Sequence, residues 1–252
     1  MTDPMLVIND IDKSFGGLQV IDNVSFSVEA GSRTALIGPN GAGKTTLFNL
    51  ISGVYPIDSG SIHLAGHNLG PVPAHLRCRF GLSRSFQNIR LMPHLSTVEN
   101  VMLGQHNRAS RLGLLAPLGL WRTRWVKEAE QSLYDAGLDT YPGQVVADLP
   151  YGVQKRIEVV RALAAHPRLL LLDEPAAGLN AAETTELLEL LRHISAQGVT
   201  LLVVEHDMHF VSRLCGEVVV LNFGKTIFQG TPADAQKDAA VLEAYLGSDH
   251  AA

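Results

Sequence analysis

The stretch LIGPNGAGKTTLFNLISG, from Leu36 to Gly53, places three glycines and a lysine between an apolar run and a helical pattern. It fits the spacing G-x-x-x-x-G-K-[ST], with Gly38 and Gly43 as its two fixed glycines. Because glycine adopts positive φ and has no Cβ, successive backbone N–H groups can turn inward around phosphate oxygens. The following helix adds its positive N-terminus. The sequence therefore predicts a nucleotide-binding phosphate loop made of Gly38, Pro39, Asn40, Gly41, Ala42, Gly43, Lys44, Thr45 and Thr46.

An ordinary glycine-rich connection between a strand and a helix is the alternative to a phosphate loop. The run RTALIG before the loop is typical of a short buried strand, and the segment 44–52 has a helical pattern that ends at Gly53. A phosphate loop requires both flanking elements, so this context favours nucleotide binding.

An acidic pair supplies the second half of the expected chemistry. Lys44 is expected to reach the β- and γ-phosphates of a triphosphate, and the Thr45 hydroxyl to ligate Mg²⁺. In LLLLDEP, Asp173 ends an apolar run, where it can hold Mg²⁺ directly or through water. Glu174 follows, placed to polarise the water that attacks the γ-phosphate. An acidic pair after a strand is often only a turn, but with Lys44 it predicts a nucleoside triphosphatase.

Composition limits the class of protein. The chain has 252 residues, 46% hydrophobic, which suits one large domain or two closely packed lobes. A net charge of −5 gives no global argument for nucleic-acid binding. We see neither a signal-peptide pattern nor an apolar run near the roughly 18 residues that cross a bilayer, so we expect a soluble chain. Cys78 and Cys215 match no metal or disulfide spacing, which indicates reduced thiols.

One segment departs from this acidic balance. Nine arginines and lysines lie between residues 77 and 127, where Glu99 is the only acid. A solvated face and a surface turned toward an anionic membrane or a partner on it both fit this pattern. The nine cations are Arg77, Arg79, Arg84, Arg90, Arg108, Arg111, Arg122, Arg124 and Lys127.

The two ends of the chain have different patterns. LVIND, LQVID, VSFSV and SGSIHLAG alternate as antiparallel strands do. Ser96, with Glu99 three residues on, predicts a capped helix, and the middle from about residue 88 to 149 is helical and loop-rich. Beyond it, strands at RLLLLDEP and VTLLVVEHD alternate with amphipathic helices, which predicts a parallel sheet covered on both faces. EVVVLNFGKTIFQG predicts a late hairpin, and Thr231-Pro232 a final helix start.

In this order the motifs resemble those of ATP-binding subunits of ABC transporters, over nearly the whole chain. The resemblance implies an α/β fold of the P-loop NTPase class, with a RecA-like parallel sheet core, an antiparallel β-subdomain and an inserted helical subdomain. It implies that Phe15 of KSFGG stacks on adenine. Gln87 of RSFQNIR would join the γ-phosphate and Mg²⁺ to the helical subdomain, and His206 of VVEHDM would contact the γ-phosphate.

The family signature L-S-G-G-Q is altered here. Leu149-Pro150-Tyr151-Gly152-Val153 stands at its place, 24 positions before Asp173, and Gly152 remains. In the family this loop presses on ATP held by the other subunit of a dimer. Pro150 either removes a hydroxyl contact to that phosphate or only sets φ at the start of the next helix. In GLN, at the dimer-contact loop, Asn180 stands where an aspartate is usual.

Further segments resemble the ATPases of branched-chain amino-acid importers, among them LMPHLSTVENV, DEPAAGLN, VVEHDM and AYLG. The ATPase of lipopolysaccharide export is the near relative. The resemblance implies an ATP-hydrolysing subunit that uses ATP and Mg²⁺. We expect residues 1–87 and 151–252 to form the nucleotide-binding core and β-subdomain, and residues 88–150 the helical subdomain.

The resemblance also implies partners and a location. We expect membrane-spanning permease subunits, a second ATPase subunit that is identical or homologous, a substrate-binding protein contacted only indirectly, and no nucleic acid. The chain would lie peripherally on the cytoplasmic face of the plasma (inner) membrane. The alternatives are a lipopolysaccharide-type exporter ATPase, a soluble ABC ATPase acting on ribosomes or DNA, and a nucleotide-binding regulator.

Overall fold

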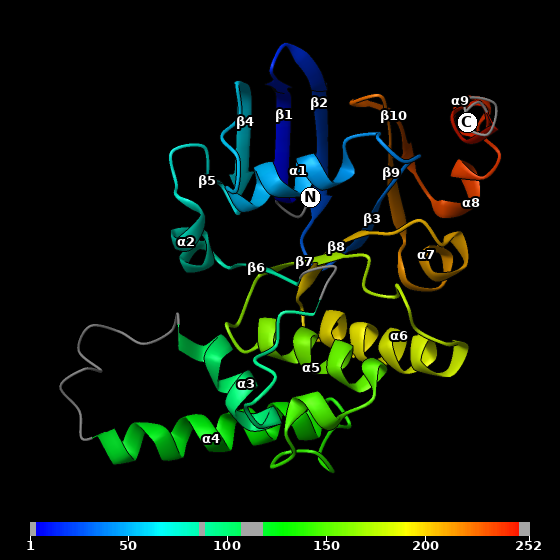
Figure 1. Ribbon diagram of the computed structural model, residues 1–252. Helices are drawn as coiled ribbons and strands as arrows, with labels where there is room; N and C mark the ends of the chain where they lie inside the picture. Colours follow the sequence, from blue (N-terminus) through cyan, green and yellow to red (C-terminus); the bar gives the residue numbers. More distant parts are fainter. Residues whose placement is uncertain (1–3, 86–88, 107–117, 247–252) are drawn as a thin grey trace.

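A six-stranded sheet forms the centre of the fold (Figure 1). The computed structural model describes residues 4–85, 89–106 and 118–246. The strand order is β10-β9-β3-β8-β7-β6, parallel from β9 to β6, with β10 joined antiparallel at one edge. This confirms the predicted parallel sheet and the late hairpin. The strands are β3 (Arg33–Ile37), β6 (Leu82–Arg84), β7 (Leu169–Asp173), β8 (Thr200–Val204), β9 (Glu217–Asn222) and β10 (Lys225–Gly230).

The second sheet is antiparallel, in the order β2-β1-β4-β5. LQVID and VSFSV, predicted as separate segments, form one strand. It continues through an irregularity at Asn23, whose φ is 52° and whose N–H donates to the Asp12 carboxylate at 2.9 Å. Asparagine tolerates this left-handed conformation, so pairing resumes beyond it. The strands are β1 (Pro4–Phe15), β2 (Leu18–Glu29), β4 (Ser59–Leu64) and β5 (His67–Asn68).

Two hydrophobic cores lie on the two faces of the six-stranded sheet. On one face α1 packs between the two sheets, with Leu47, Phe48 and Ile51 fully buried (Figure 1). On the other face lie α5 and α6. Alternate residues of each strand face alternate cores, which is why these strands are apolar throughout. The longer helices are α1 (Lys44–Ser52), α3 (Thr97–Gln105), α4 (Leu118–Asp135), α5 (Tyr151–Leu163), α6 (Ala181–Ala196), α7 (Met208–Leu214) and α9 (Ala239–Leu246).

The predicted helix ends are confirmed where capping chemistry marked them. Ser96 and Glu99 form both halves of a capping box at α3. Gly53 ends α1 at φ 78°, and Thr231 caps the short helix α8 (Pro232–Ala235). This helix is not the final one as predicted, because α9 follows it. In the part of the chain that the structure describes, no helix is both long and apolar enough to span a membrane.

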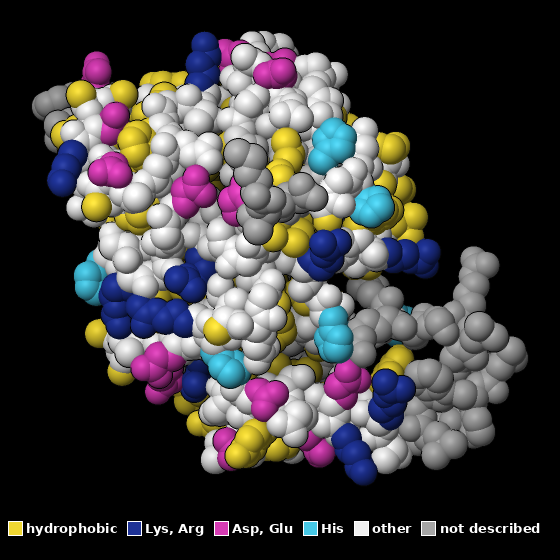
Figure 2. All heavy atoms as spheres, turned by 180° about the vertical axis from the view of Figure 1, so that it is seen from behind, with side chains coloured by type: hydrophobic (Ala, Val, Ile, Leu, Met, Phe, Trp, Pro, Cys, Tyr) yellow, Lys and Arg dark blue, Asp and Glu magenta, His cyan; other side chains and the backbone are white. Residues whose placement is uncertain are grey.

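The cations between residues 77 and 127 do not all face solvent. Arg77 ends the short helix α2 (Ala74–Arg77) with 5% of its surface exposed. Its guanidinium donates to the carbonyls of Leu50 and Ile51, at 2.7 and 2.6 Å, and to two carbonyls of the loop before α2, those of Leu69 and Val72. Arg84 also points inward. On the face shown in Figure 2, basic and acidic side chains are interspersed. The side chains of Arg108, Arg111 and Arg122 lie outside the described part.

Replacing Arg77 should destabilise the fold. Arg77→Met keeps most of the side-chain volume but leaves buried carbonyls without a donor. We expect the free energy of unfolding in urea to fall by about 2–4 kcal/mol, since burial of the charge offsets part of the gain from its hydrogen bonds. Arg79→Met, at an exposed neighbouring position, is the control and should change it by less than about 0.5 kcal/mol. Similar losses for both variants would contradict this account.

Candidate nucleotide-binding site

The phosphate loop runs between β3 and α1 and lies tightly against two other strands. Gly38 has φ 149°, and a Cβ there would collide with the carbonyl of Leu221 in β9. Gly43 has φ 101°, and its Cβ would lie 2.8 Å from the Ile21 side chain of β2. Glycine is therefore required at both positions by conformation and by space, as the motif spacing predicted.

Lys44 lies inside this loop. Its Nζ donates to the carbonyls of Gly38 and Pro39, at 2.7 and 2.9 Å. Burial lowers the pKa of the Lys44 ammonium, and the nearby carboxylate of Glu174 partly opposes that shift. Thr45 is exposed in the first turn of α1, which carries no acidic residue. The loop thus presents a cation, a hydroxyl and a positive helix end to the same space, a combination that suits phosphate oxygens.

Asp173 and Glu174 lie at the carboxyl end of β7. Asp173 pairs in register with Val204 of β8, and the Glu174 N–H donates to the Val204 carbonyl at 2.9 Å. The strand that carries this pair is not the direct neighbour of the strand that feeds the phosphate loop, because β8 lies between β3 and β7. The pair still emerges at the same edge, because all three strands are parallel.

The donor set around Asp173 fits Mg²⁺. Among the described residues no group of three or more His, Cys, Asp and Glu could hold a metal by itself. A carboxylate from Asp173 and a hydroxyl from Thr45 are hard oxygen ligands. Mg²⁺ is usually held by one or two such protein groups, with substrate phosphates and water completing its octahedron. Asp173 and Thr45 would be the protein's contribution.

His206 follows β8 and has an exposed side chain, 66% accessible. The residue before it, Glu205, is almost fully buried and accepts the N–H groups of Ala176 and His206 at 3.0 and 3.2 Å. Burial raises the pKa of Glu205, and these donors oppose the shift. Sequence reasoning missed Glu205, although an acid at the end of a buried strand is a signal for it. It ties the segment after Glu174 to the His206 segment.

Phe15 ends β1 and is 40% exposed. The Tyr55 ring meets it edge-on with centroids 5.1 Å apart, and Lys13 Nζ lies 5.3 Å from its centroid. Tyr55 was also missed from sequence, because nothing local links it to Phe15. The half-exposed ring is held in place and still has accessible surface for a base to stack on.

The segment 149–153 meets a different part of its own chain. Pro150 is the N-cap of α5 at φ −54°, one position before the helix begins. A Cβ on Gly152 would lie 2.6 Å from the Glu183 carboxylate of α6. Asn180 caps α6 by accepting the N–H groups of Ala182 and Glu183, both at 3.0 Å, a role that asparagine and aspartate share. Gly152 thus packs on α6, while Gln87 lies outside the described residues.

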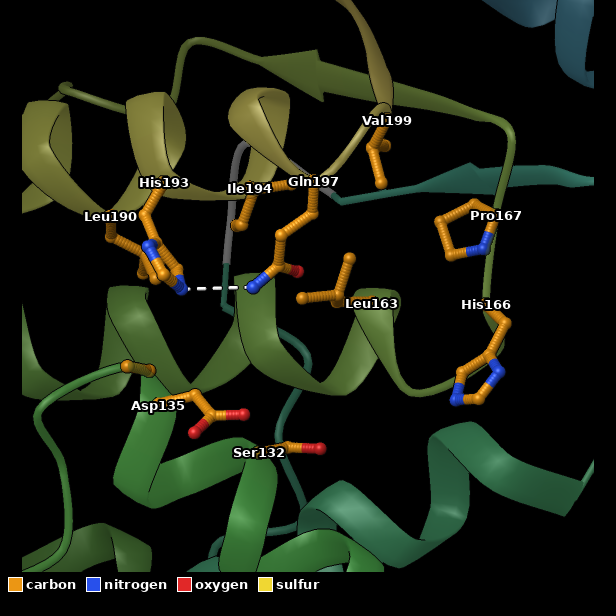
Figure 3. Close-up of a pocket in the computed structure, with 11 residues that line it drawn as sticks. Ser132, Asp135, Leu163, His166, Pro167, Leu190, His193, Ile194, Gln197 and Val199 are labelled. Carbon is orange, nitrogen blue, oxygen red and sulfur yellow. Dashed lines mark hydrogen bonds between the residues drawn. The ribbon is translucent and has the colours of Figure 1, made fainter.

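A separate pocket of about 330 Å³ lies elsewhere (Figure 3). Pro167, just before β7, and Val199, just before β8, help to line it, so it lies at the amino ends of these strands, opposite the phosphate loop. His193 and Gln197 of the α6 end are hydrogen-bonded at its rim. None of the predicted site residues lines it.

Comparison with known proteins gives the family. The family model described as ABC transporter matches residues 21–177, and one described as branched-chain amino acid ATP-binding cassette transporter matches residues 225–251. The high-affinity branched-chain amino acid transport ATP-binding protein BraF of Pseudomonas aeruginosa is 38% identical over 98% of this chain and 99% of its own. The corresponding LivG of Escherichia coli is 36% identical with the same coverage.

A solved structure agrees with the predicted fold. The ADP conformation of MJ1267, an ATP-binding cassette of an ABC transporter, superposes with a TM-score of 0.86 at 28% identity, covering 98% of this chain and 100% of that one. This confirms the P-loop NTPase fold class. Since the first family model covers more than half of the chain and the relatives match nearly all of it, the protein belongs to the ABC transporter family as an ATP-binding subunit.

Proposed function

We propose that this subunit hydrolyses ATP to power the import of branched-chain amino acids through separate membrane subunits. The observation that carries the proposal is that the phosphate loop after β3 and the acidic pair at the end of β7 leave the parallel sheet at the same carboxyl edge, in a chain similar over 98% of its length to BraF and LivG. The match of residues 225–251 supports the same substrate class.

Each site residue has a role in this proposal. Lys44 and the N–H groups of the phosphate loop neutralise the β- and γ-phosphates. Asp173 and Thr45 would hold Mg²⁺, which would neutralise charge that develops on the phosphates. Glu174 accepts a proton from the attacking water, and His206 donates to the γ-phosphate. Gln87 is proposed to complete the metal site from the segment between β6 and α3.

Two subunits are proposed to share two ATP molecules. As the family resemblance implies, the segment 149–153, whose Gly152 packs on Glu183, is proposed to act at the site of a second, identical or homologous, subunit. Its remaining donors are the Gly152 N–H and the positive end of α5. Residues 88–150 would move as a helical subdomain relative to the core formed by 1–87 and 151–252.

A groove of about 570 Å³ is the proposed docking place for a permease subunit. It is lined by residues from α2, β6, α3 and α5. Its floor combines apolar side chains such as Met92 and Leu103 with three guanidinium groups. The lining residues are Ser52, Ala74, Arg77, Cys78, Leu82, Ser83, Arg84, Met92, Leu103, Gly104, Arg161, Ala162 and Ala165.

The relatives favour import over the alternatives. BraF and LivG are named for branched-chain amino acid transport, which supports an importer rather than a lipopolysaccharide-type exporter. Their match over nearly their full length also gives no support to a soluble ABC ATPase or a regulator. On this proposal the chain lies peripherally at the cytoplasmic face of the inner membrane, and a substrate-binding protein acts through the permease.

Replacing Glu174 should separate binding from turnover. Glu174→Gln removes the proton acceptor and adds no charge, so ATP should still bind while hydrolysis falls at least about 100-fold. ATP-dependent dimers should accumulate on a sizing column. Glu189→Gln, on the exposed face of α6, is the matched control and should keep the parental rate. Turnover near the parental rate in Glu174→Gln would show that this residue has been assigned wrongly.

In the proposed contact, Phe15 stacks on the face of the nucleotide base and forms no hydrogen bonds to the base edge. Phe15→Ala should therefore weaken binding of ATP and GTP alike, by about 1–3 kcal/mol, the range for stacking of a base on an aromatic ring. Titration with each nucleotide measures this. Leu18→Ala, an exposed apolar residue of the same hairpin, should change neither by more than twofold. A loss for ATP alone would point to specific base readout.

Thiol labelling can locate the permease. Cys78 lines the groove and is partly exposed, whereas Cys215 is buried, which raises the pKa of its thiol to about 12. A maleimide should label Cys78 of the isolated chain and react at least tenfold more slowly in the native membrane complex. Cys78→Ala shows that the label is on Cys78, and a cysteine placed at Glu189 should stay accessible throughout. Equal rates at Cys78 in both states would exclude docking in this groove.

A further inference from the structure

We infer that Arg84 is a positioning residue that orients Asp173 for Mg²⁺ and links this carboxylate to the groove. The inference rests on the proposed function of Asp173 as the metal-holding acid. Arg84 is the last residue of β6, and its Nη2 lies 2.7 Å from Asp173 Oδ2. The two side chains are 10% and 8% exposed. Removing the partner of a buried carboxylate is strongly destabilising, because the buried charge is then left uncompensated.

The other half of the guanidinium is anchored on α1. Nη1 donates to Asn49 Oδ1 at 2.7 Å and to Ser52 Oγ at 2.9 Å, and the central carbon lies 5.7 Å from the Phe48 ring centroid. The planar guanidinium has fixed donors on two sides. It therefore keeps this position while Asp173 binds a metal. Arg84 thus ties the helix that begins at Lys44 to the end of β7.

This clamp determines which way the carboxylate faces. With Oδ2 bonded to Arg84, the Asp173 carboxylate cannot rotate freely, and its other oxygen is left for the metal. Mg²⁺ demands a near-ideal octahedron, so a ligand held in one orientation binds it better than a rotating one. Partners that orient metal ligands in this way change metal affinity by about 10–100-fold when removed.

The same guanidinium borders the groove. Arg84 and Ser52 both line it, so one side chain separates an occupant of the groove from Asp173. An occupant that displaces Arg84 therefore changes the metal site directly. The distance spanned is one arginine side chain, and no movement of the sheet is needed.

The test measures the Mg²⁺ concentration for half-maximal binding of a fluorescent ATP analogue to the purified chain. Arg84→Gln should raise it about tenfold or more. Arg84→Lys keeps the charge but lacks the fork that bonds α1 and Asp173 together, so it should raise this Mg²⁺ concentration less than Arg84→Gln does. Asn49→Ala should also raise it less. ADP binding in EDTA should stay within twofold in each variant. Arg33→Gln is the matched control and should change neither the Mg²⁺ requirement nor ADP binding. Arg33 is a half-buried arginine at the amino end of β3.

Three results would overturn the inference. One is a parental Mg²⁺ requirement in Arg84→Gln, or, if that variant does not fold, in both Arg84→Lys and Asn49→Ala. The second is a loss of ADP binding in EDTA as large as the loss of Mg²⁺-dependent binding, which would show that Arg84 has only a structural role. The third is an equal shift in Arg33→Gln. If the parent protein itself shows no Mg²⁺ dependence, the proposed role of Asp173 fails instead, so the two failures are distinguishable.

A label in the groove tests the link. A bulky maleimide on Cys78 should raise the Mg²⁺ requirement of the parent at least threefold and leave that of Arg84→Gln unchanged, since the two perturbations would act through one contact. Arg33→Gln should respond to the label as the parent does. An equal shift with and without Arg84, or no shift in the parent, would contradict the link.

Discussion

The close approach of the phosphate loop to the backbone of two other strands is the constraint on which the site depends. Gly38 lies against the Leu221 carbonyl of β9, and Gly43 against Ile21 of β2. The turn after β9 closes the arrangement, because Gly224 donates to the Ala42 carbonyl and accepts from Asp22. The phosphate loop therefore contacts both sheets. A side chain at Gly38 would collide with β9 of the parallel sheet, and one at Gly43 would collide with β2 of the antiparallel sheet.

The candidate site residues lie on one side of the sheet because β3, β8 and β7 run parallel. Three functional segments leave these strands at the same edge, although 135 positions of sequence separate Gly38 from Asp173. Burial at that edge has a cost, which specific donors offset. Asp173 has Arg84, and Glu205 has the N–H groups that follow β7 and β8. These buried acids therefore serve as fixed points that hold the loops around them.

The arginines between residues 77 and 127 whose side chains the structure describes divide into two kinds. Arg77 and Arg84 have interior partners and join α1 to the elements around it, whereas Arg90 and Arg124 are exposed. A count of charges along the chain cannot separate these kinds, because the count is the same whether a guanidinium meets water or a carbonyl. Arg77 and Arg84, the two arginines with interior partners, both line the groove.

Sequence alone determined the features that depend on residues close together in the chain. The phosphate loop, the acidic pair, the capping box at Ser96 and the alternation of strands and helices all express contacts within one or two turns. The roles of Phe15, Gln87, His206 and Gly152 came from family resemblance and remain proposals.

Only the tertiary structure decided which distant groups meet. The strand β8 lies between β3 and β7, Arg84 reaches Asp173 across 89 positions, Glu205 accepts from Ala176, and Tyr55 meets Phe15. The physical reason is that these pairings result from the packing of whole elements. Each depends on sheet order and on the burial of many side chains at once, and no spacing within a short window of sequence records that order.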